Sequence, residues 1–210
     1  MGIAIPQVIA EDRASGAQVI DGSIVFDRSR LKHLKRTIST TGNQRTFTVS
    51  AWFKQCRFQD QQYLFTSEYL GSGNEYFELT LSAGYQLQLY NSKSAVVNIK
   101  PSALLRDTAW YHIVVAVDTT VSPAEDRVKF YINGERQTDF AAGHSAFPAE
   151  NYAFELSNSR DWFIGAAEFS NSIQGHYDGP MSNFYFVDGQ ALRPEEFGFT
   201  DPLTNTWRPK

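Results

Sequence analysis

The chain has 210 residues, of which 42% are hydrophobic and 20% charged, so it has enough apolar side chain for one domain with a sizeable core. Its formal net charge of -4 argues against a nucleic-acid partner, because such binding depends on clustered lysine and arginine. Cys56 is the only cysteine, which excludes an intramolecular disulfide. No segment has the length and apolarity of a signal peptide or a membrane span, so we expect synthesis in a cytoplasm and no membrane insertion.

The first 21 residues combine a short apolar run, a proline, and then small and charged residues. We predict that residues 1–21 form an N-terminal arm and that residues 22–210 form one domain, whose first strand lies near 23–27. An apolar strip with no obvious place in a domain usually binds another surface, and we therefore expect the arm to contact a partner. The strip consists of Ile3, Ile5, Val8 and Ile9.

Apolar residues occupy every second position in three segments, at 47–53, 77–81 and 87–89. This alternation places one side of a strand in a core and the other toward solvent, as antiparallel sheets require. The basic cluster at 28–36 (RSRLKHLKR) is interpreted in the same way, as a strand with a solvated face. A patch for phosphate or anionic glycan is the alternative reading of that cluster.

Two segments are apolar at successive positions, 110–117 (WYHIVVAV) and 184–187 (FYFV), and are predicted to be strands covered on both faces. His112 lies within the first of them and is expected to be a core histidine with a backbone partner. Asn133-Gly134, between two strand-like runs, predicts a two-residue hairpin turn, because both residues tolerate positive φ. Pro194–Gly198 predicts a single short helical turn.

Many short strands with frequent turns and little helix indicate an all-β fold. We predict a two-sheet antiparallel β-sandwich of the lectin-like jelly-roll type, with one short C-terminal helical turn.

Four segments resemble the concanavalin A-like, laminin-G-like jelly roll, and more closely the version found in virion proteins of tailed bacteriophages. The resemblance extends over roughly residues 22–208. The segments are Thr41–Lys54 (TGNQRTFTVSAWFK), Ala109–Thr120 (AWYHIVVAVDTT), Arg127–Gly134 (RVKFYING), and Tyr177–Gly179 (YDG) with Phe186–Gly198 (FVDGQALRPEEFG).

The resemblance implies a structural or adhesion module of a phage virion, tail-fibre-like, that binds host-surface glycan. It also implies other virion proteins as partners and a homo-oligomer, a trimer as in phage fibres. The alternative is a capsid or tail decoration protein with a purely structural role. A polysaccharide-degrading enzyme is a second alternative.

Sugar binding needs a flat aromatic ring beside amides or acids, and the turn-rich stretch 141–160 is the best candidate for a functional loop. The glycan-binding candidates are Asn151, Tyr152, Asn158 and Trp162. Related jelly rolls often hold calcium through loop acids and amides, which makes calcium a candidate ligand. Plain turn roles are the alternative for these residues. The calcium candidates are Asp118, Asp126, Asp178 and Asn183.

Catalytic residues are not predicted. Jelly-roll glycanases use two carboxylates that flank the scissile bond. Glu75 and Glu78 are three apart on a predicted strand and should face opposite sides, while Glu195 and Glu196 belong to the short helical turn. The sequence therefore favours a binding protein over an enzyme.

Overall fold

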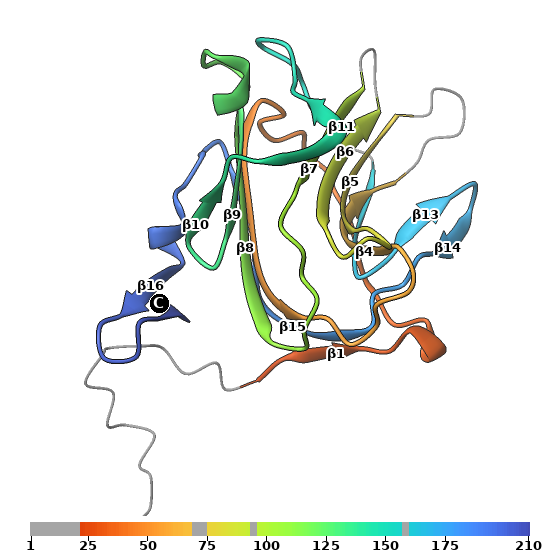
Figure 1. Ribbon diagram of the computed structural model, residues 1–210. Coiled ribbons are helices and arrows are strands. Elements are labelled where there is room, and N and C mark those ends of the chain that lie inside the picture. Colours follow the sequence, from red (N-terminus) through yellow and green to blue (C-terminus); the bar gives the residue numbers. More distant parts are fainter. Residues whose placement is uncertain (1–21, 69–74, 93–95, 157–159) are drawn as a thin grey trace, which may run out of the picture.

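A computed structural model describes residues 22–68, 75–92, 96–156 and 160–210. Two antiparallel sheets pack face to face, and Figure 1 shows the strands of one on the left and along the bottom and those of the other on the upper right. This confirms the predicted two-sheet antiparallel sandwich. The division into an arm at 1–21 and a domain at 22–210 stays a prediction, since the arm lies outside the described residues.

In both large sheets every pair of neighbouring strands is antiparallel. The six-stranded sheet has the order β1 (Ile24–Phe26), β15 (Gly179–Asp188), β3 (Thr46–Lys54), β8 (Trp110–Asp118), β9 (Val128–Ile132) and β10 (Glu135–Gln137). The seven-stranded sheet has the order β11 (Phe140–Ala146), β7 (Val97–Pro101), β6 (Leu87–Ser92), β5 (Tyr76–Leu81), β4 (Gln62–Ser67), β12 (Asp161–Ile164) and β2 (Leu34–Thr37).

Two small hairpins complete the strands, β13 (Ala167–Phe169) with β14 (Ser172–Gln174) and β16 (Gly198–Asp201) with β17 (Thr206–Pro209). Helix in the described part of the chain is confined to three-residue 3-10 turns, which are far too short to cross a bilayer. They are η1 (Arg28–Arg30), η2 (Ala124–Asp126) and η3 (Pro194–Glu196), the last at the predicted C-terminal turn.

The core lies between the two sheets and is built by the alternation seen in the sequence. Phe47, Val49, Ala51 and Phe53 of β3 are all buried and point into it. Opposite them, β5 and β6 contribute every second residue, such as Phe77. Edge-to-face contacts join these rings, with 6.0 Å between the Phe47 and Phe77 centroids.

The outer face of β3 and β8 is also buried, because the C-terminal residues cover it. Trp207 of β17 stacks on His112 and donates a 2.9 Å hydrogen bond from Nε1 to His112 Nδ1. His112 Nε2 therefore carries the proton and donates to Ser50 Oγ at 2.9 Å. This confirms the 110–117 strand as a doubly covered, central one. The partners of His112 are side chains rather than the expected backbone group.

Three local predictions were wrong. Residues 184–187 lie in β15, which is covered less completely than expected, and Tyr185 is 45% exposed. The basic cluster at 28–36 is split between η1 and β2 because Asp27 caps a turn there. The stretch 141–160 is not one long loop, because β11 continues to Ala146 and pairs with β7.

The Asn133-Gly134 turn is confirmed, with φ values of 50° and 83°. A Cβ on Gly134 would lie 2.5 Å from Trp207 Cε3, so any substitution meets both strain and a packed ring. We expect Gly134→Val to lower the free energy of unfolding by about 1–3 kcal/mol.

Thermal or urea denaturation measures this effect. Gly143→Val is the matched control, since Gly143 also has positive φ but nothing lies within 4 Å of its Cβ position. The Gly134 variant should therefore be the less stable of the two. Equal melting temperatures would show that Trp207 does not hold this turn.

Candidate functional site

Four neighbouring strands present a row of side chains on the outer face of the seven-stranded sheet. Glu78 of β5 pairs with Thr66 of β4 and with Tyr90 of β6, and Tyr90 pairs with Asn98 of β7. These residues alternate with core residues, so their side chains point away from the core. We call this region the aromatic face and define it as Tyr63, Tyr76, Glu78, Thr80, Gln88, Tyr90, Asn98 and Phe169.

Aromatic rings form a continuous series across this face. Tyr76 and Tyr90 stack with their centroids 5.6 Å apart and their planes at 25°. Phe169 contacts Tyr76 edge to face at 5.9 Å and lies 5.7 Å from Tyr63. All four rings are partly exposed, so the series offers apolar surface to a ligand.

The β13–β14 hairpin stands beside this face and limits it on one side. Figure 1 shows the hairpin projecting from the seven-stranded sheet, on the side away from the other sheet. Its base is fixed to β4, because Tyr63 N donates to Gly175 O at 3.1 Å and Thr66 Oγ1 donates to Ala166 O at 3.0 Å. Phe169 of β13 is thus held against the tyrosines from the sheet.

Glu78 is the unusual group of the face. Its side chain is only 7% exposed, and burial raises the pKa of its carboxyl to about 8. At neutral pH the group is therefore mostly a neutral acid. In that form it offers one hydrogen-bond donor as well as acceptors. Burial also raises the pKa of the Tyr63 and Tyr76 hydroxyls, which remain protonated.

Further polar groups surround the rings. Gln88 Nε2 donates to Asn98 Oδ1 at 2.8 Å, which fixes two amides side by side on β6 and β7. Thr80 Oγ1 is buried and has no hydrogen-bond partner among the described residues. The face thus combines flat rings with hydroxyl, amide and carboxyl groups.

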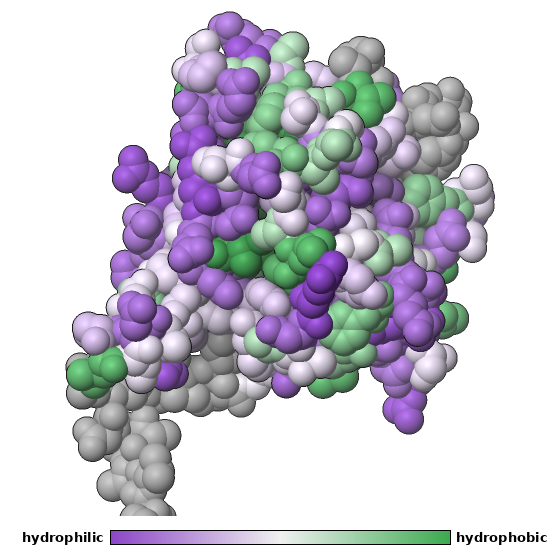
Figure 2. Space-filling view, viewed as in Figure 1, coloured by the Kyte–Doolittle hydropathy of each residue, from purple (hydrophilic) through white to green (hydrophobic). Residues whose placement is uncertain are grey.

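A second recess lies between the C-terminal hairpin and the strands β8 to β10. Its volume is about 990 Å³, and Trp110, Tyr111 and Trp207 are among its lining residues. Trp110 is 37% exposed there. Figure 2 shows hydrophobic residues gathered near the centre of this view of the molecule, among hydrophilic ones. The recess is the alternative place for a ligand.

The glycan candidates from the sequence do not share one open surface. Tyr152 is 8% exposed and belongs to the core, where its hydroxyl accepts a 2.9 Å bond from Asn91 Nδ2. Asn151 is exposed in a turn with φ of 60°. Trp162 packs at the margin of the core, 4.6 Å from the ring of Phe186. Asn158 lies outside the described residues.

A buried polar network explains why this segment is structural. Arg160 Nη2 lies 2.8 Å from Glu155 Oε1, and both side chains are about 5% exposed or less. Arg160 Nη1 also donates to the carbonyls of Glu68 and Glu75, at 2.9 and 2.7 Å. Glu155 N donates to Asn91 Oδ1 at 2.9 Å. These bonds tie Glu155 to β6, and Arg160 to the residues that directly follow β4 and precede β5.

The four calcium candidates are not brought together. Asp118 faces Thr46 at one end of β3, whereas the carbonyl of Asp178 accepts a bond from Cys56 N just beyond the other end. Asp118 Oδ1 caps its own turn by accepting from Thr120. The remaining two have other local partners: Asp126 pairs with Arg136 and Lys129, and Asn183 Oδ1 accepts from Ser182 Oγ.

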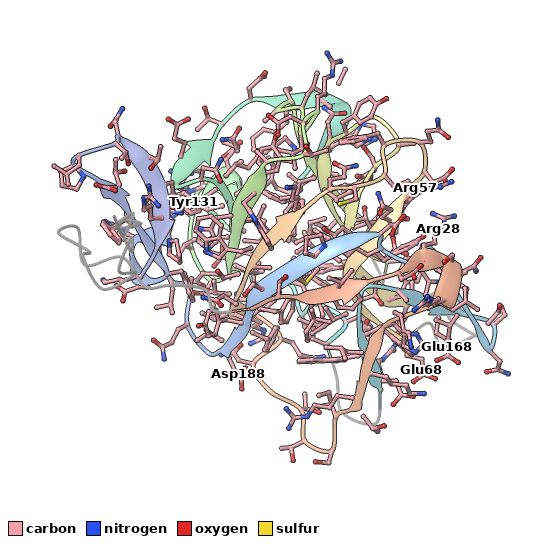
Figure 3. All side chains as sticks on the ribbon, turned by 90° about the horizontal axis from the view of Figure 1, so that it is seen from below. Arg28, Arg57, Glu68, Tyr131, Glu168 and Asp188 are labelled. Atoms are coloured by element: carbon pink, nitrogen blue, oxygen red, sulfur yellow. The ribbon has the colours of Figure 1, made fainter. Side chains whose placement is uncertain are left out.

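The described carboxylates that do meet are Glu68, Asp161 and Glu168, whose ligand atoms lie within 4.8 Å of one another. Figure 3 shows Glu68 and Glu168 close together on one side of the molecule, far from Tyr131 and Asp188. Lys35 supplies the counter-charge, because its Nζ lies 2.5 Å from Asp161 Oδ2 and 4.0 Å from Glu168 Oε2. The hydrogen bond to Asp161 raises the pKa of Lys35 above its ordinary value. The cluster is therefore already neutralised in part by a lysine.

Sequence reasoning missed the aromatic face. The alternation at 76–81 and 87–90 correctly placed Tyr76, Glu78 and Thr80 on the face away from the core, but Glu78 and Thr80 are buried there rather than solvated. That tyrosines from β4, β5 and β6 adjoin on this side follows only from strand order and register. A solvent-side pattern rich in tyrosine, glutamine and asparagine was the available signal.

Comparison with known proteins agrees with this architecture. Domain 4 of AbnA, an extracellular arabinanase of Geobacillus stearothermophilus solved in complex with arabinotriose, is 16% identical, with a TM-score of 0.61 over 86% of this chain and 76% of that one. The CBM40 of Ruminococcus gnavus IT-sialidase, bound to α2,3-sialyllactose, is 11% identical, with a TM-score of 0.57 over 83% and 96%. Domains LG4-5 of the mouse laminin α1 chain are 16% identical, with a TM-score of 0.56 over 93% and 48%.

At such identities these structures share the fold with this chain and nothing finer. No curated protein sequence matches significantly. The family model described as "Concanavalin A-like lectin/glucanases superfamily" matches residues 32–196, which is most of the chain. The protein therefore belongs to the concanavalin A-like lectin/glucanase superfamily, in its laminin-G-like branch.

Proposed function

We propose that this protein is a glycan-binding module that holds an oligosaccharide on its aromatic face and does not cleave it. The observation that carries the proposal is the series of rings from Tyr90 through Tyr76 to Phe169, beside the amides of Gln88 and Asn98. A sugar has apolar C–H faces and a rim of hydroxyls. Rings with a few placed polar groups match both features.

The polar groups on this face suit a neutral sugar. The amides of Gln88 and Asn98 are partly exposed and can donate to and accept from sugar hydroxyls. Two of the structurally similar proteins were solved with oligosaccharides, arabinotriose and sialyllactose, which agrees with a glycan ligand for this fold.

We expect Tyr90→Ala to weaken glycan binding about tenfold or more, which corresponds to about 1.4 kcal/mol. Removal of the ring takes away stacking surface but leaves β6 and its core residues in place. The measurement is a glycan array with the purified chain, followed by titration calorimetry on the glycans that bind.

Trp110→Ala is the matched control, since it removes a partly exposed ring from the alternative recess. Loss of binding in the Trp110 variant with none in the Tyr90 variant would move the site to that recess. A purified, folded chain that binds no glycan at all would contradict the proposed function.

The proposal that the protein does not cleave its ligand has its own test. We expect no release of reducing ends from any polysaccharide that binds, even at high protein concentration, because a glycosidase needs a second carboxyl placed across the bond from the first. A reducing-sugar assay measures this. Release that Glu78→Gln abolishes would show that Glu78 is a catalytic acid and that the protein is an enzyme.

We place this module in the virion of a tailed phage, where it attaches to host-surface glycan. The support is the sequence resemblance of four segments within residues 41–198. A shallow site gives an affinity in the millimolar range, about 4 kcal/mol, so attachment needs several copies whose avidity adds roughly 10²–10⁴. A homo-oligomer, a trimer by analogy with phage fibres, and other virion proteins as partners complete the proposal.

Decoration of a capsid or tail is the second candidate function. The exposed apolar residues Ile24, Val25 and Leu34 favour it, since they offer a surface to another protein. Neighbouring genes discriminate between the two: tail genes favour an adhesin and capsid genes favour a decoration protein.

A further inference from the structure

An apolar groove runs along the open side of the sandwich, between the edge strands β1 and β2. One part, of about 540 Å³, is lined by Ile24, Met181 and their neighbours. A second part, of about 390 Å³, is lined by Trp162 and Phe186 among others. Leu34, Ile164 and Phe184 line both parts, so the two are continuous. We call it the edge groove.

The groove leaves apolar side chains and backbone uncovered at the same place. Ile24 and Leu34, which line the groove, are 53% and 44% exposed. β1 pairs only with β15, and β2 pairs only with β12, so each has one free edge in the described part of the chain. Free edges beside an apolar groove are a typical acceptor for an extended segment, which adds as a strand.

The chain carries a segment that suits this acceptor. Residues 3–9 (IAIPQVI) contain four branched aliphatic side chains and no charge. They precede Gly22, the first described residue, which itself lines the groove. Twelve residues separate Ile9 from Gly22, enough for about 40 Å when extended, so residues 3–9 can reach the groove.

The charges beside the segment and in the groove also favour docking of this segment. Glu11 and Asp12 follow the apolar segment after Ala10, and Arg13 follows them, so residues 11–13 carry a net charge of -1. Lys35 and Arg36 of β2 line the groove, and Arg36 is exposed. A segment that enters between the edges with its acids toward β2 brings opposite charges together.

We propose that the edge groove is the docking site for the N-terminal segment, residues 3–9, of a copy of this chain. When the segment docks in the groove of its own chain, it covers the open side of that chain's sandwich. When it docks in the groove of another copy, it links the copies into an oligomer. The groove does not include any residue of the aromatic face, so the inference does not depend on glycan binding.

Cysteine cross-linking in the full chain tests the proposal. In a Cys56→Ser background, which removes the exposed native thiol, Ile5→Cys is combined with Leu34→Cys in the groove. The matched control combines Ile5→Cys with Leu203→Cys, because Leu203 is an exposed leucine on the distant C-terminal hairpin. Mild oxidation forms the cross-link, and a non-reducing gel measures how fast it appears. Melting temperatures check that each variant is folded.

We expect the Leu34 pair to cross-link at least about tenfold faster than the Leu203 pair, because docking raises the effective concentration of the two thiols. A cross-linked monomer places the segment in its own groove, and a cross-linked dimer places it in a neighbour's groove. Adding Val8→Asp should slow the reaction to the control rate. Equal rates for the two pairs, or no effect of Val8→Asp, would overturn the proposal.

Discussion

Replacement of Glu155 with glutamine is expected to lower the free energy of unfolding by about 3–5 kcal/mol. Glu155 and Arg160 form an ion pair with side chains that are 4% and 5% exposed. The variant keeps the shape of the side chain but leaves the Arg160 charge without its buried counter-charge. Urea denaturation measures the change, and the slope with urea should stay the same.

Glu75→Gln is the matched control, because Glu75 also faces Arg160 but at 3.7 Å and with 41% exposure. An exposed partner of this kind contributes about 1 kcal/mol or less. The double variant Glu155→Met, Arg160→Met should recover part of the lost stability, since it removes both charges together. If Glu155→Gln and Glu75→Gln have the same small effect, the buried pair contributes no more to stability than the exposed contact does.

Replacement of Glu78 with glutamine should change how stability depends on pH. Burial raises the pKa of the Glu78 carboxyl from 4.5 to about 8. Between these values the unfolded chain has released the proton and the folded protein still holds it. The unfolded state therefore binds fewer protons, and stability falls as pH rises through this window. The full loss is on the order of 3–5 kcal/mol.

His112 opposes this trend in the lower part of the window. Burial lowers its pKa from 6.5 to about 4, so the unfolded chain takes up the proton first as pH falls. Its contribution is present above pH 6.5 and is lost toward pH 4. The two effects roughly cancel between about pH 4.5 and 6.5, and the wild-type protein should lose stability from there to pH 8.

Glu78→Gln should match the wild type near pH 4.5 and exceed it at pH 8 by about 3–5 kcal/mol. Melting temperatures at half-unit pH steps measure the difference. His112→Gln is the informative comparison, because it should leave the Glu78 decline visible over the whole window. A constant difference between Glu78→Gln and the wild type at all pH values would show that Glu78 is ionised in the folded protein.

The two surfaces proposed for binding share only β4, whose Tyr63 belongs to the aromatic face and whose Phe65 lines the edge groove. The aromatic face lies over β4 to β7, and the edge groove lies between β1 and β2, with β12 and β15 in its walls. A docked N-terminal segment would therefore leave the aromatic face free. On these two proposals, one surface anchors the protein and the other binds glycan.

Local pattern was enough to predict the strands that build the core. Phe47, Val49 and Phe53 show the period of two that a half-buried strand requires, and the structure buries all three. The Asn133-Gly134 turn was also readable, because positive φ at two successive positions limits the residues allowed. Fold class, strand content and this hairpin depend on interactions between residues close in the sequence.

The roles of Tyr152 and Trp162 could not be predicted from local pattern in the same way. Tyr152 and Trp162 are amphipathic, and the sequence does not say whether such a ring stacks on a ligand or packs on a core. Contacts with Asn91 and Phe186, which are distant in the sequence, decide that both pack against the core. Asp161 similarly receives Lys35 and Thr37 of β2 as partners, and Arg160 receives the carbonyls of Glu68 and Glu75.

The sequence by itself determined the alternation, the turns and hence an all-β sandwich, because each depends on backbone geometry and burial over a few residues. The tertiary structure alone decided which strands are neighbours and in what register. Only that order places Tyr63, Tyr76 and Tyr90 beside Glu78, whose carboxyl has a pKa of about 8. Strands that are distant in the sequence come into contact when the chain between them closes into a loop and both pack on a shared core. No local pattern encodes which pairs of strands will meet.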